Sequence, residues 1–411
     1  MLSAARRDYV SSQLGALNAG GPQLRANVGE ALMASAFAAL SLSEELATAH
    51  RDRWGNWDWM FSRAHRLGAL YRPWLDEEIL TGVDGGVRPP VWPNGAPFAL
   101  CLTHDVDLVT KSPGMRAAGR DVSRAFNVPM SLAERGQLVA GGAWRLGRSL
   151  LQRTDPLWCY EKWIDLEAQL GMTSTFFFFP SSLASPHKWD ASYRFDDRVR
   201  YRREHMNVQG MMQAIHAAGC EIGVHGSIAS ARVRGVLARE RLEIERVLGS
   251  PIVSGRQHYL CYDAQTTPAL WADALVRVDS THGFNRGIGF RCGTSFPYRV
   301  WDFANDRASD TIEVPQHIMD RSLFAPDALE YNADMAISHC IQMMDAVERV
   351  GGCLTLSWHP NNLTSEKHWV TYRTLLEEAR ARRAWGAGTG AVAGVWRKRL
   401  AAPTSSALAV K

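Results

Sequence analysis

The stretch "FALCLTHDVDLV", from Phe98 to Val109, is an apolar run with an abruptly charged end. The run shows no alternation of polar and apolar residues, which is typical of a β-strand buried on both faces in a parallel sheet. His104, Asp105 and Asp107 follow it almost at once. Ionisable side chains in such a place are costly unless something pairs them. This strand end is therefore the first candidate for a functional site.

Similar apolar runs recur along the chain. With the first run, they lie at 97–103, 173–179, 220–225, 252–256, 312–315 and 353–358. Between several of them, apolar residues recur at helical spacing, and Gly219, Gly249 and Gly351 stand where these helices should end. Strand-like runs that alternate with helices predict an α/β fold with a parallel sheet, either open or closed into a barrel.

The chain is expected to have three parts. Residues 1–90 are predicted to form a helical N-terminal extension packed on the main domain, because their sequence is rich in Ala and Leu. Pro and Gly residues at 86–97 mark the boundary, and the main domain is expected over 91–400. Within it, residues from about 110 to 155 are predicted to be an insertion. Residues 401–411 are predicted to be a disordered tail.

Composition narrows the class of protein. The 411 residues carry a net charge of only +4, which gives no strong signal for nucleic-acid binding. No apolar segment is long enough to span a membrane, and the N-terminus lacks the apolar core of a secretory signal. The seven cysteines form no CxxC pair, which favours a reducing compartment. We therefore expect a cytoplasmic protein with a small-molecule or sugar substrate, and leave its oligomeric state open.

Ionisable side chains stand at the C-terminal ends of most predicted strands, where such folds place their chemistry. They are His104, Asp105, Asp107, His225, Arg256, His258, His317, Asp320 and His359. Asp105 and Asp107 are two positions apart in an extended segment, so they should point to the same side. One carboxylate can hold a divalent metal while the other takes a proton from water, and a histidine can protonate a leaving amine. This set of groups predicts amide hydrolysis.

In these residues the chain resembles the polysaccharide deacetylase family, also called the NodB homology domain or carbohydrate esterase family 4. "THDVD" resembles the Asp-x-Asp branch of the first family motif. "EIGVHGSIAS", "SGRQHYL" and "LSWH" resemble later motifs, in the family's order. The resemblance covers residues from about 90 to 365 and implies a distorted (β/α)7 barrel.

The resemblance also implies roles for individual residues. Asp105 corresponds to the general base, Arg256 to the arginine that orients this base, and His359 to the general acid. Asp107 and His225 correspond to ligands of a divalent metal ion.

One position departs from the family pattern. The second motif is usually His-x-x-x-His, but Ala229 stands where its second histidine is expected. His258 stands where the family usually has a proline, and it could complete a ligand set with Asp107 and His225. Two histidines and one carboxylate suit Zn²⁺ with an open position for water. A metal-free hydrolase, similar to allantoinase-like relatives of the family, is the alternative.

Three other residues are candidates for substrate binding. The backbone N–H of Tyr259 could donate to an oxyanion, as the residue after the proline does in the family. Arg291 could bind a carboxylate or phosphate of the substrate, or form a structural ion pair. Trp358 could form an apolar wall for an acyl methyl group.

The leading hypothesis is a hydrolase that removes an acetyl or formyl group from an N-acylated sugar or related small molecule inside the cell, in glycan or natural-product biosynthesis. The second hypothesis is metal-free hydrolysis of a ureide-like amide. The third is a catalytically silent carbohydrate-binding protein, with "WGNWDWMF" (54–61) as its stacking surface. Packing of this aromatic segment against the main domain is the competing interpretation.

Overall fold

The apolar run after Phe98 forms the central strand β1 (Ala99–Val106), and all 8 of its residues are buried. Along one edge β1 pairs with β11 (Cys353–Ser357). Along the other edge it pairs first with β12 (Trp385–Ala387) and then with β2 (Thr175–Phe178). All three ladders are parallel. Because neighbours cover both edges and both faces, every side chain of β1 meets protein rather than water, which explains its unbroken apolar run.

The computed structural model describes residues 2–17, 29–82, 91–109, 125–126, 130–151, 160–180, 187, 189–191 and 193–401. Much of the predicted insertion at 110–155 lies outside these ranges, as does the predicted tail beyond residue 401.

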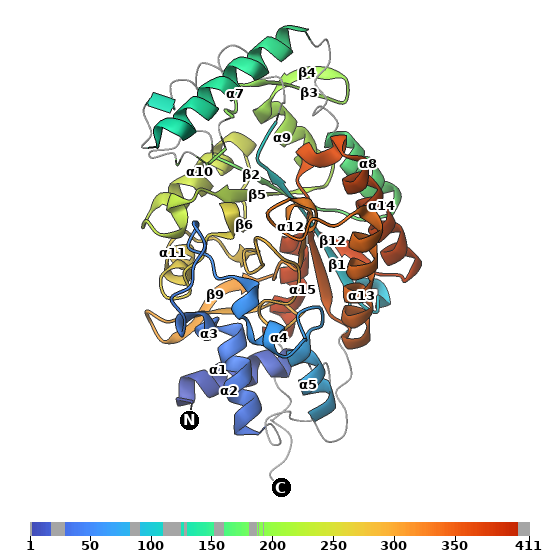
Figure 1. Cartoon of the computed structure of the whole chain (residues 1–411). Coiled ribbons are helices and arrows are strands. Elements are labelled where there is room, and N and C mark those ends of the chain that lie inside the picture. Colours follow the sequence, from blue (N-terminus) through green and yellow to red (C-terminus); the bar gives the residue numbers. More distant parts are fainter. Residues whose placement is uncertain are drawn as a thin grey trace.

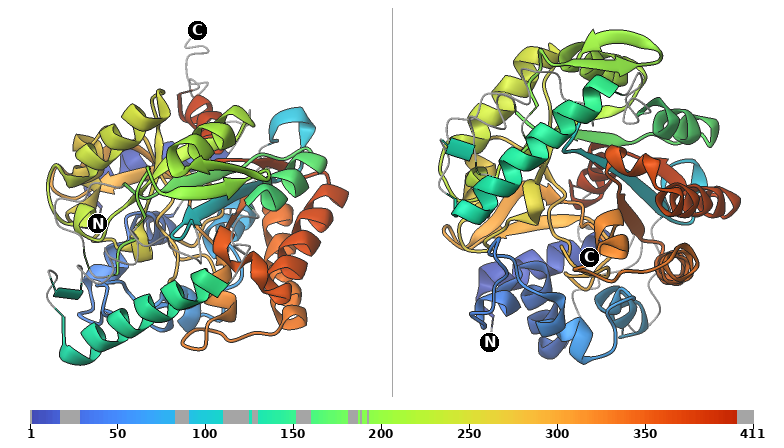
Figure 2. Two further views of the ribbon diagram at one scale, coloured as in Figure 1. Left: turned by 90° about the horizontal axis from the view of Figure 1, so that it is seen from above. Right: turned by 45° about the horizontal axis from the view of Figure 1, so that its top comes forward.

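The main sheet extends from β1 in both directions and curls (Figures 1 and 2). Its strand order is β10-β11-β1-β2-β5-β6-β7-β9-β8, with β12 beside β1. The further strands are β5 (Glu221–Gly226), β6 (Ser254–Gln257), β7 (Val278–Asp279), β8 (Tyr298–Asp302), β9 (Arg307–Glu313) and β10 (Ile318–Met319). Among the ladders between described strands of this sheet, only the one between β8 and β9 is antiparallel. Among the described strands no ladder joins β8 to β10, so the sheet is a curled, open barrel. The predicted α/β class with a distorted barrel is confirmed.

Helices pack on both faces of the sheet (Figure 2). They are α8 (Tyr160–Gln169), α9 (Val208–Ala217), α10 (Val236–Leu248), α11 (Thr267–Asp273), α12 (Asp320–Phe324), α13 (Ala333–Val350), α14 (Glu366–Ala381) and α15 (Thr389–Ala401). Asn207 and Asn332 cap the first turns of α9 and α13 through their side chains. Gly249 and Gly351 end α10 and α13 in the left-handed conformation, as the sequence predicted.

The N-terminal residues form short helices at one end of the molecule (Figure 1). They are α1 (Ala4–Leu17), α2 (Glu30–Leu40), α3 (Ser43–Leu46), η2 (Trp59–Phe61), α4 (Arg63–Arg66) and α5 (Trp74–Gly82). Their apolar side chains join one hydrophobic cluster with residues of β1, β8 and β9. Tyr9 and Phe37, for example, pack against Trp301 of β8 at ring distances of 5.0 and 5.3 Å. The N-terminal helices and the sheet therefore share a core.

The remaining elements are short or lie apart from the sheet. Helix α7 (Leu132–Leu151) lies at the end of the molecule opposite to the N-terminal helices (Figure 1). The other elements are β3 (Arg198–Tyr201), β4 (Glu204–Asn207), η3 (Pro93–Gly95), η4 (Ala229–Ala231), η5 (His258–Leu260) and η6 (Pro360–Thr364). None of the described helices has the length and apolar character that crossing a membrane requires.

Candidate active site

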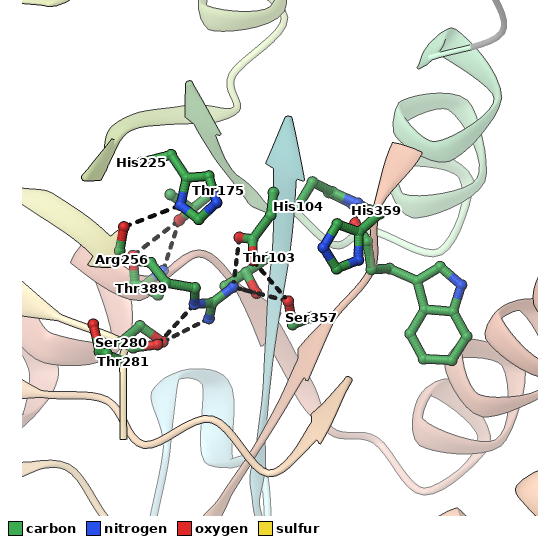
Figure 3. Close-up of polar contacts among 12 residues, drawn as sticks. Thr103, His104, Thr175, His225, Arg256, Ser280, Thr281, Ser357, His359 and Thr389 are labelled. Atoms are coloured by element: carbon green, nitrogen blue, oxygen red, sulfur yellow. Dashed lines mark hydrogen bonds and ion pairs between the residues drawn. The ribbon is translucent and has the colours of Figure 1, made fainter. Parts of the chain in front are cut away.

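Asp105, near the end of β1, is paired with Arg256 of β6. Both side chains are buried, and Arg256 Nη1 donates to Asp105 Oδ1 at 2.8 Å. The same nitrogen donates to Thr103 Oγ1 and Ser357 Oγ, while Nε and Nη2 donate to the backbone oxygen and hydroxyl of Ser280 (Figure 3). Burial alone raises the pKa of Asp105, but the charges of Arg256, His225 and His359 outweigh it and hold this pKa below its usual value. Asp105 is therefore an oriented, ionised carboxylate.

Asp107, just after β1, lies opposite two histidines from the ends of β5 and β6. His225 at the end of β5 places Nε2 3.3 Å from Asp107 Oδ1, and His258 after β6 places Nε2 3.7 Å from the same oxygen. Within the described part of the chain, Asp107 Oδ1 is shielded from solvent and has no hydrogen-bond partner. The structure thus brings together the three side chains predicted as metal ligands. Ala229, at the usual position of the second histidine in the sequence, has no ligand atom.

The donor atoms of this group fit a zinc-like ion. Nitrogen and oxygen ligands bind Zn²⁺ at about 2.0–2.1 Å, so neighbouring ligands of a tetrahedral site lie about 3.3 Å apart. The second nitrogen of each ring is held from behind, because His225 Nδ1 contacts the Arg256 carbonyl at 3.0 Å and His258 Nδ1 contacts Asp190 Oδ1 at 3.2 Å. Such partners orient metal-binding histidines and fix their tautomer. Asp107, His225 and His258 can therefore hold a divalent metal.

His359, after β11, faces Asp107 from the other side, and Figure 3 shows His225 and His359 on opposite sides of the end of β1. His359 Nε2 lies 3.5 Å from Asp107 Oδ2. Its Nδ1 contacts Asp320 Oδ1 at 2.6 Å, and its backbone N–H donates to Asp320 Oδ2. Burial lowers the pKa of His359, but the negative charges of Asp320, Asp107 and Asp105 outweigh this effect and raise it to about 10. His359 is thus held as a protonated group.

These groups line one open cleft. Its walls are formed by Asp105, Asp107, His225, Gln257, His258, Tyr259, Leu260, Asn285, Met319, Arg321 and His359. Tyr259 has a φ of 55°, a left-handed conformation that needs outside support. Asn56 and Asn285 donate to its carbonyl at 2.6 and 3.0 Å, and its ring stacks on Trp54 at 4.1 Å. The segment predicted as an aromatic cluster therefore packs beside the cleft.

Other predicted residues lie away from the cleft. Arg291 is buried and forms two hydrogen bonds of 2.7 Å to Glu45, so the structural ion pair is the arrangement observed. Trp358 is fully buried beside Tyr372 and is not among the cleft-lining residues. His104 faces the core, where Nε2 contacts Glu167 at 2.7 Å and Nδ1 contacts the Trp358 carbonyl.

His317 also lies outside the cleft, because Nδ1 accepts from the Thr355 N–H and Nε2 contacts the Thr294 carbonyl. Asp320, by contrast, does contact His359.

The sequence analysis missed several residues that shape the site. Asp190 supports His258, Asn56 and Asn285 hold the Tyr259 carbonyl, and Arg321 lines the cleft. None of them lies within a predicted strand-like run. A signal was present for two of them, since Arg321 follows Asp320 directly and Asn56 lies within the aromatic segment 54–61.

Among known proteins, similarity to this chain is found with solved structures and not with family models or curated sequences. No family model matches the chain, and no curated protein matches it. A solved structure from Mycobacterium smegmatis, provisionally described as a polysaccharide deacetylase, is 20% identical and has a TM-score of 0.49 over 76% of this chain and 94% of its own.

Two further solved structures are similar. One is an allantoinase, 13% identical, with a TM-score of 0.46 over 77% of this chain and 96% of its own. The other, from Pseudomonas aeruginosa PAO1, is provisionally described as a polysaccharide deacetylase; it is 14% identical, with a TM-score of 0.46 over 78% of this chain and 97% of its own.

Proposed function

We propose that the protein is a hydrolase of carbon–nitrogen bonds that removes an N-acyl group, acetyl or formyl, from a sugar or related small molecule. The supporting observation is the convergence of three arrangements on one cleft. These are the Asp105–Arg256 pair, the group of Asp107, His225 and His258, and the His359–Asp320 pair. Amide hydrolysis needs a base, an acid and stabilisation of negative charge, and each arrangement can supply one of them.

Each residue takes one role in this reaction. Asp105, ionised and oriented by Arg256, accepts a proton from the attacking water as the oxygen bonds to the acyl carbon. The backbone N–H of Tyr259 donates to the oxygen that becomes negative. His359 then donates its proton to the nitrogen as the carbon–nitrogen bond breaks, which gives a carboxylic acid and an amine. A divalent ion held by Asp107, His225 and His258 would supply Lewis-acid chemistry at the same place.

The lining of the cleft supports the proposed substrate class. It is open and contains polar groups on the reacting side, while Tyr259 and Met319 add apolar surface. A small acylated sugar presents both polar and apolar faces of this kind. We place the reaction in the cytoplasm, in glycan or natural-product biosynthesis; the six described cysteines are all free and buried, which is compatible with a reducing compartment.

The proposal is tested by release of acetate or formate from a panel of N-acetylated and N-formylated sugars. Asp105→Asn should lower kcat by about 10²- to 10⁴-fold, because the proton acceptor is lost while the side-chain shape is kept. A chelator should abolish the wild-type activity, and Zn²⁺ should restore it. Asp334→Asn, at an exposed site on α13, is the matched control and should leave the rate unchanged. An Asp105→Asn protein with a near-normal rate would contradict the assigned base.

A further inference from the structure

A second cluster of ionisable side chains lies two strands away from the cleft residue His225. Asp279 ends β7, Glu313 ends the neighbouring strand β9, and His282 lies in the loop after β7. One ligand atom of each lies within 4.8 Å of the others. All three residues are at most 1% exposed. The proposed reaction uses none of them.

The two carboxylates of this cluster face each other, and among the described residues no arginine or lysine forms an ion pair with either; Arg256 and Arg291 act on them only from a distance. Asp279 and Glu313 are direct partners in the parallel ladder between β7 and β9, so both side chains leave the sheet on the same face. Two negative charges at such positions are destabilising. Burial raises the pKa of Asp279 to about 7, and burial together with the neighbouring Asp279 raises that of Glu313 well above its usual value.

The two nearest arginines are engaged elsewhere. Arg256 gives its hydrogen bonds to Asp105, to hydroxyl groups and to the Ser280 carbonyl. Arg291 gives its hydrogen bonds to Glu45 and the Gly283 carbonyl. Among the described residues, neither arginine donates a hydrogen bond to Asp279 or Glu313.

His282 presents an electron pair to the same space. Tyr298 donates its hydroxyl proton to Cys292 Sγ at 2.9 Å, so the phenol oxygen accepts the Nδ1–H of His282 at 2.6 Å. The lone pair then lies on Nε2, which is 3.8 Å from Glu313 Oε2. Both atoms are buried and have no hydrogen-bond partner among the described residues. The opposite tautomer would not satisfy them either, because 3.8 Å is too long for a hydrogen bond.

We propose that Asp279, His282 and Glu313 hold a divalent transition-metal ion in a closed, structural site. A cation would neutralise the two facing carboxylates and satisfy both orphaned atoms at once. One imidazole with two carboxylates suits Zn²⁺ or Mn²⁺ better than Mg²⁺ or Ca²⁺, which prefer oxygen ligands alone. The ion would also fix the loop after β7, and Ser280 in this loop holds Arg256, the partner of the catalytic base.

The decisive experiment is anomalous diffraction at the zinc edge from crystals of the full chain, expressed in zinc-supplemented medium. We expect a peak between Asp279, His282 and Glu313, and we expect it also in His258→Ala, a variant that removes a proposed cleft ligand. Absence of that peak overturns the inference. The cleft is measured in the same map, so a missing ion there would count against the proposed function and not against this site.

Zinc content in solution gives a second, independent measurement. His258→Ala should retain one zinc ion per chain after dialysis, and adding Glu313→Gln should remove it. Asp310→Asn, which changes an exposed acid of the same strand β9, is the control and should keep that ion. Retention of the ion in the Glu313→Gln protein overturns the proposed ligand set. If Glu313→Gln does not fold, the diffraction experiment on the wild type still decides.

Discussion

His359 is held by two contacts from a single residue, Asp320. One fixes the imidazole ring and the other fixes the backbone N–H. Asn362 donates a further hydrogen bond to Asp320, so the carboxylate itself has little freedom. The position of the proposed acid therefore depends on a side chain that does not line the cleft.

This arrangement predicts the effect of Asp320→Asn. The amide can keep part of the hydrogen bonding but supplies no charge to stabilise a protonated imidazole, so we expect kcat to fall by about 10²-fold. The loss should shrink for substrates whose leaving amine is less basic, because these need less help from an acid. A series of substrates with graded leaving groups measures this trend. An equal loss across the series would indicate a merely structural role for Asp320.

At the residue scale, the sequence predicted six side chains that the structure places together. Asp105, Asp107, His225, Arg256, His258 and His359 meet because parallel strands deliver their carboxyl ends to one edge of the sheet. Trp358 could have been excluded by the alternation of side chains along an extended segment. Ser357 points to Arg256 and His359 to Asp107, so Trp358 between them faces the core.

At the scale of elements, close packing of neighbouring strands limits the residues that fit. Gly223 lies in β5 between β2 and β6. A Cβ there would lie 2.6 Å from the Phe177 ring and 2.8 Å from the Ser254 carbonyl. The ring and the neighbouring backbone cannot both withdraw, because each belongs to a paired strand.

We therefore expect Gly223→Ala to lower the free energy of unfolding by about 1–3 kcal/mol. Gly141 in α7 is the matched comparison, because nothing lies within 4 Å of the position of its added Cβ. Gly141→Ala should be neutral or stabilising by up to about 1 kcal/mol, since Ala favours helix. Urea unfolding of both variants measures the difference. Equal effects at the two sites would contradict the packing argument.

The six predicted strand-like runs overlap β1, β2, β5, β6, β9 and β11. The run at 312–315 meets β9 only at its last two residues, and β6 is buried although its residues are mostly polar. The sequence analysis did not identify β7 and β10, which have 2 residues each and are too short to form a pattern. Nor did it identify β8, which is mixed polar and apolar at an edge of the sheet. Such strands are defined by their partners rather than by their own residues.

At the scale of the whole molecule, one buried carboxylate joins the N-terminal helices to the main domain. Asp76 of α5 accepts hydrogen bonds from Thr294 Oγ1 at 2.6 Å and from the N–H and hydroxyl of Ser295 at 2.7 Å. It is 1% exposed. Burial raises its pKa to about 7, although these three hydrogen bonds act in the opposite direction.

This shift predicts how stability depends on pH. The ordinary pKa of the carboxyl is 3.8, so between that value and about 7 the folded state holds a proton that the unfolded state releases. The contribution of Asp76 to stability is therefore complete below about pH 4 and is lost as the pH rises through 7. Asp76→Asn should remove this dependence, so its stability relative to the wild type should increase from pH 5 to pH 8. Parallel denaturation profiles for the two proteins across that range would contradict the assignment.

The pairing of β1 has a consequence for the order in which the protein can form during synthesis. Its partners lie at 175–178, 353–357 and 385–387, so one edge stays bare until the last part of the chain has left the ribosome. Contacts between residues this far apart in the sequence slow folding. Until they form, apolar surface stays exposed and favours aggregation. The strand that carries Asp105 is thus made early and enclosed late.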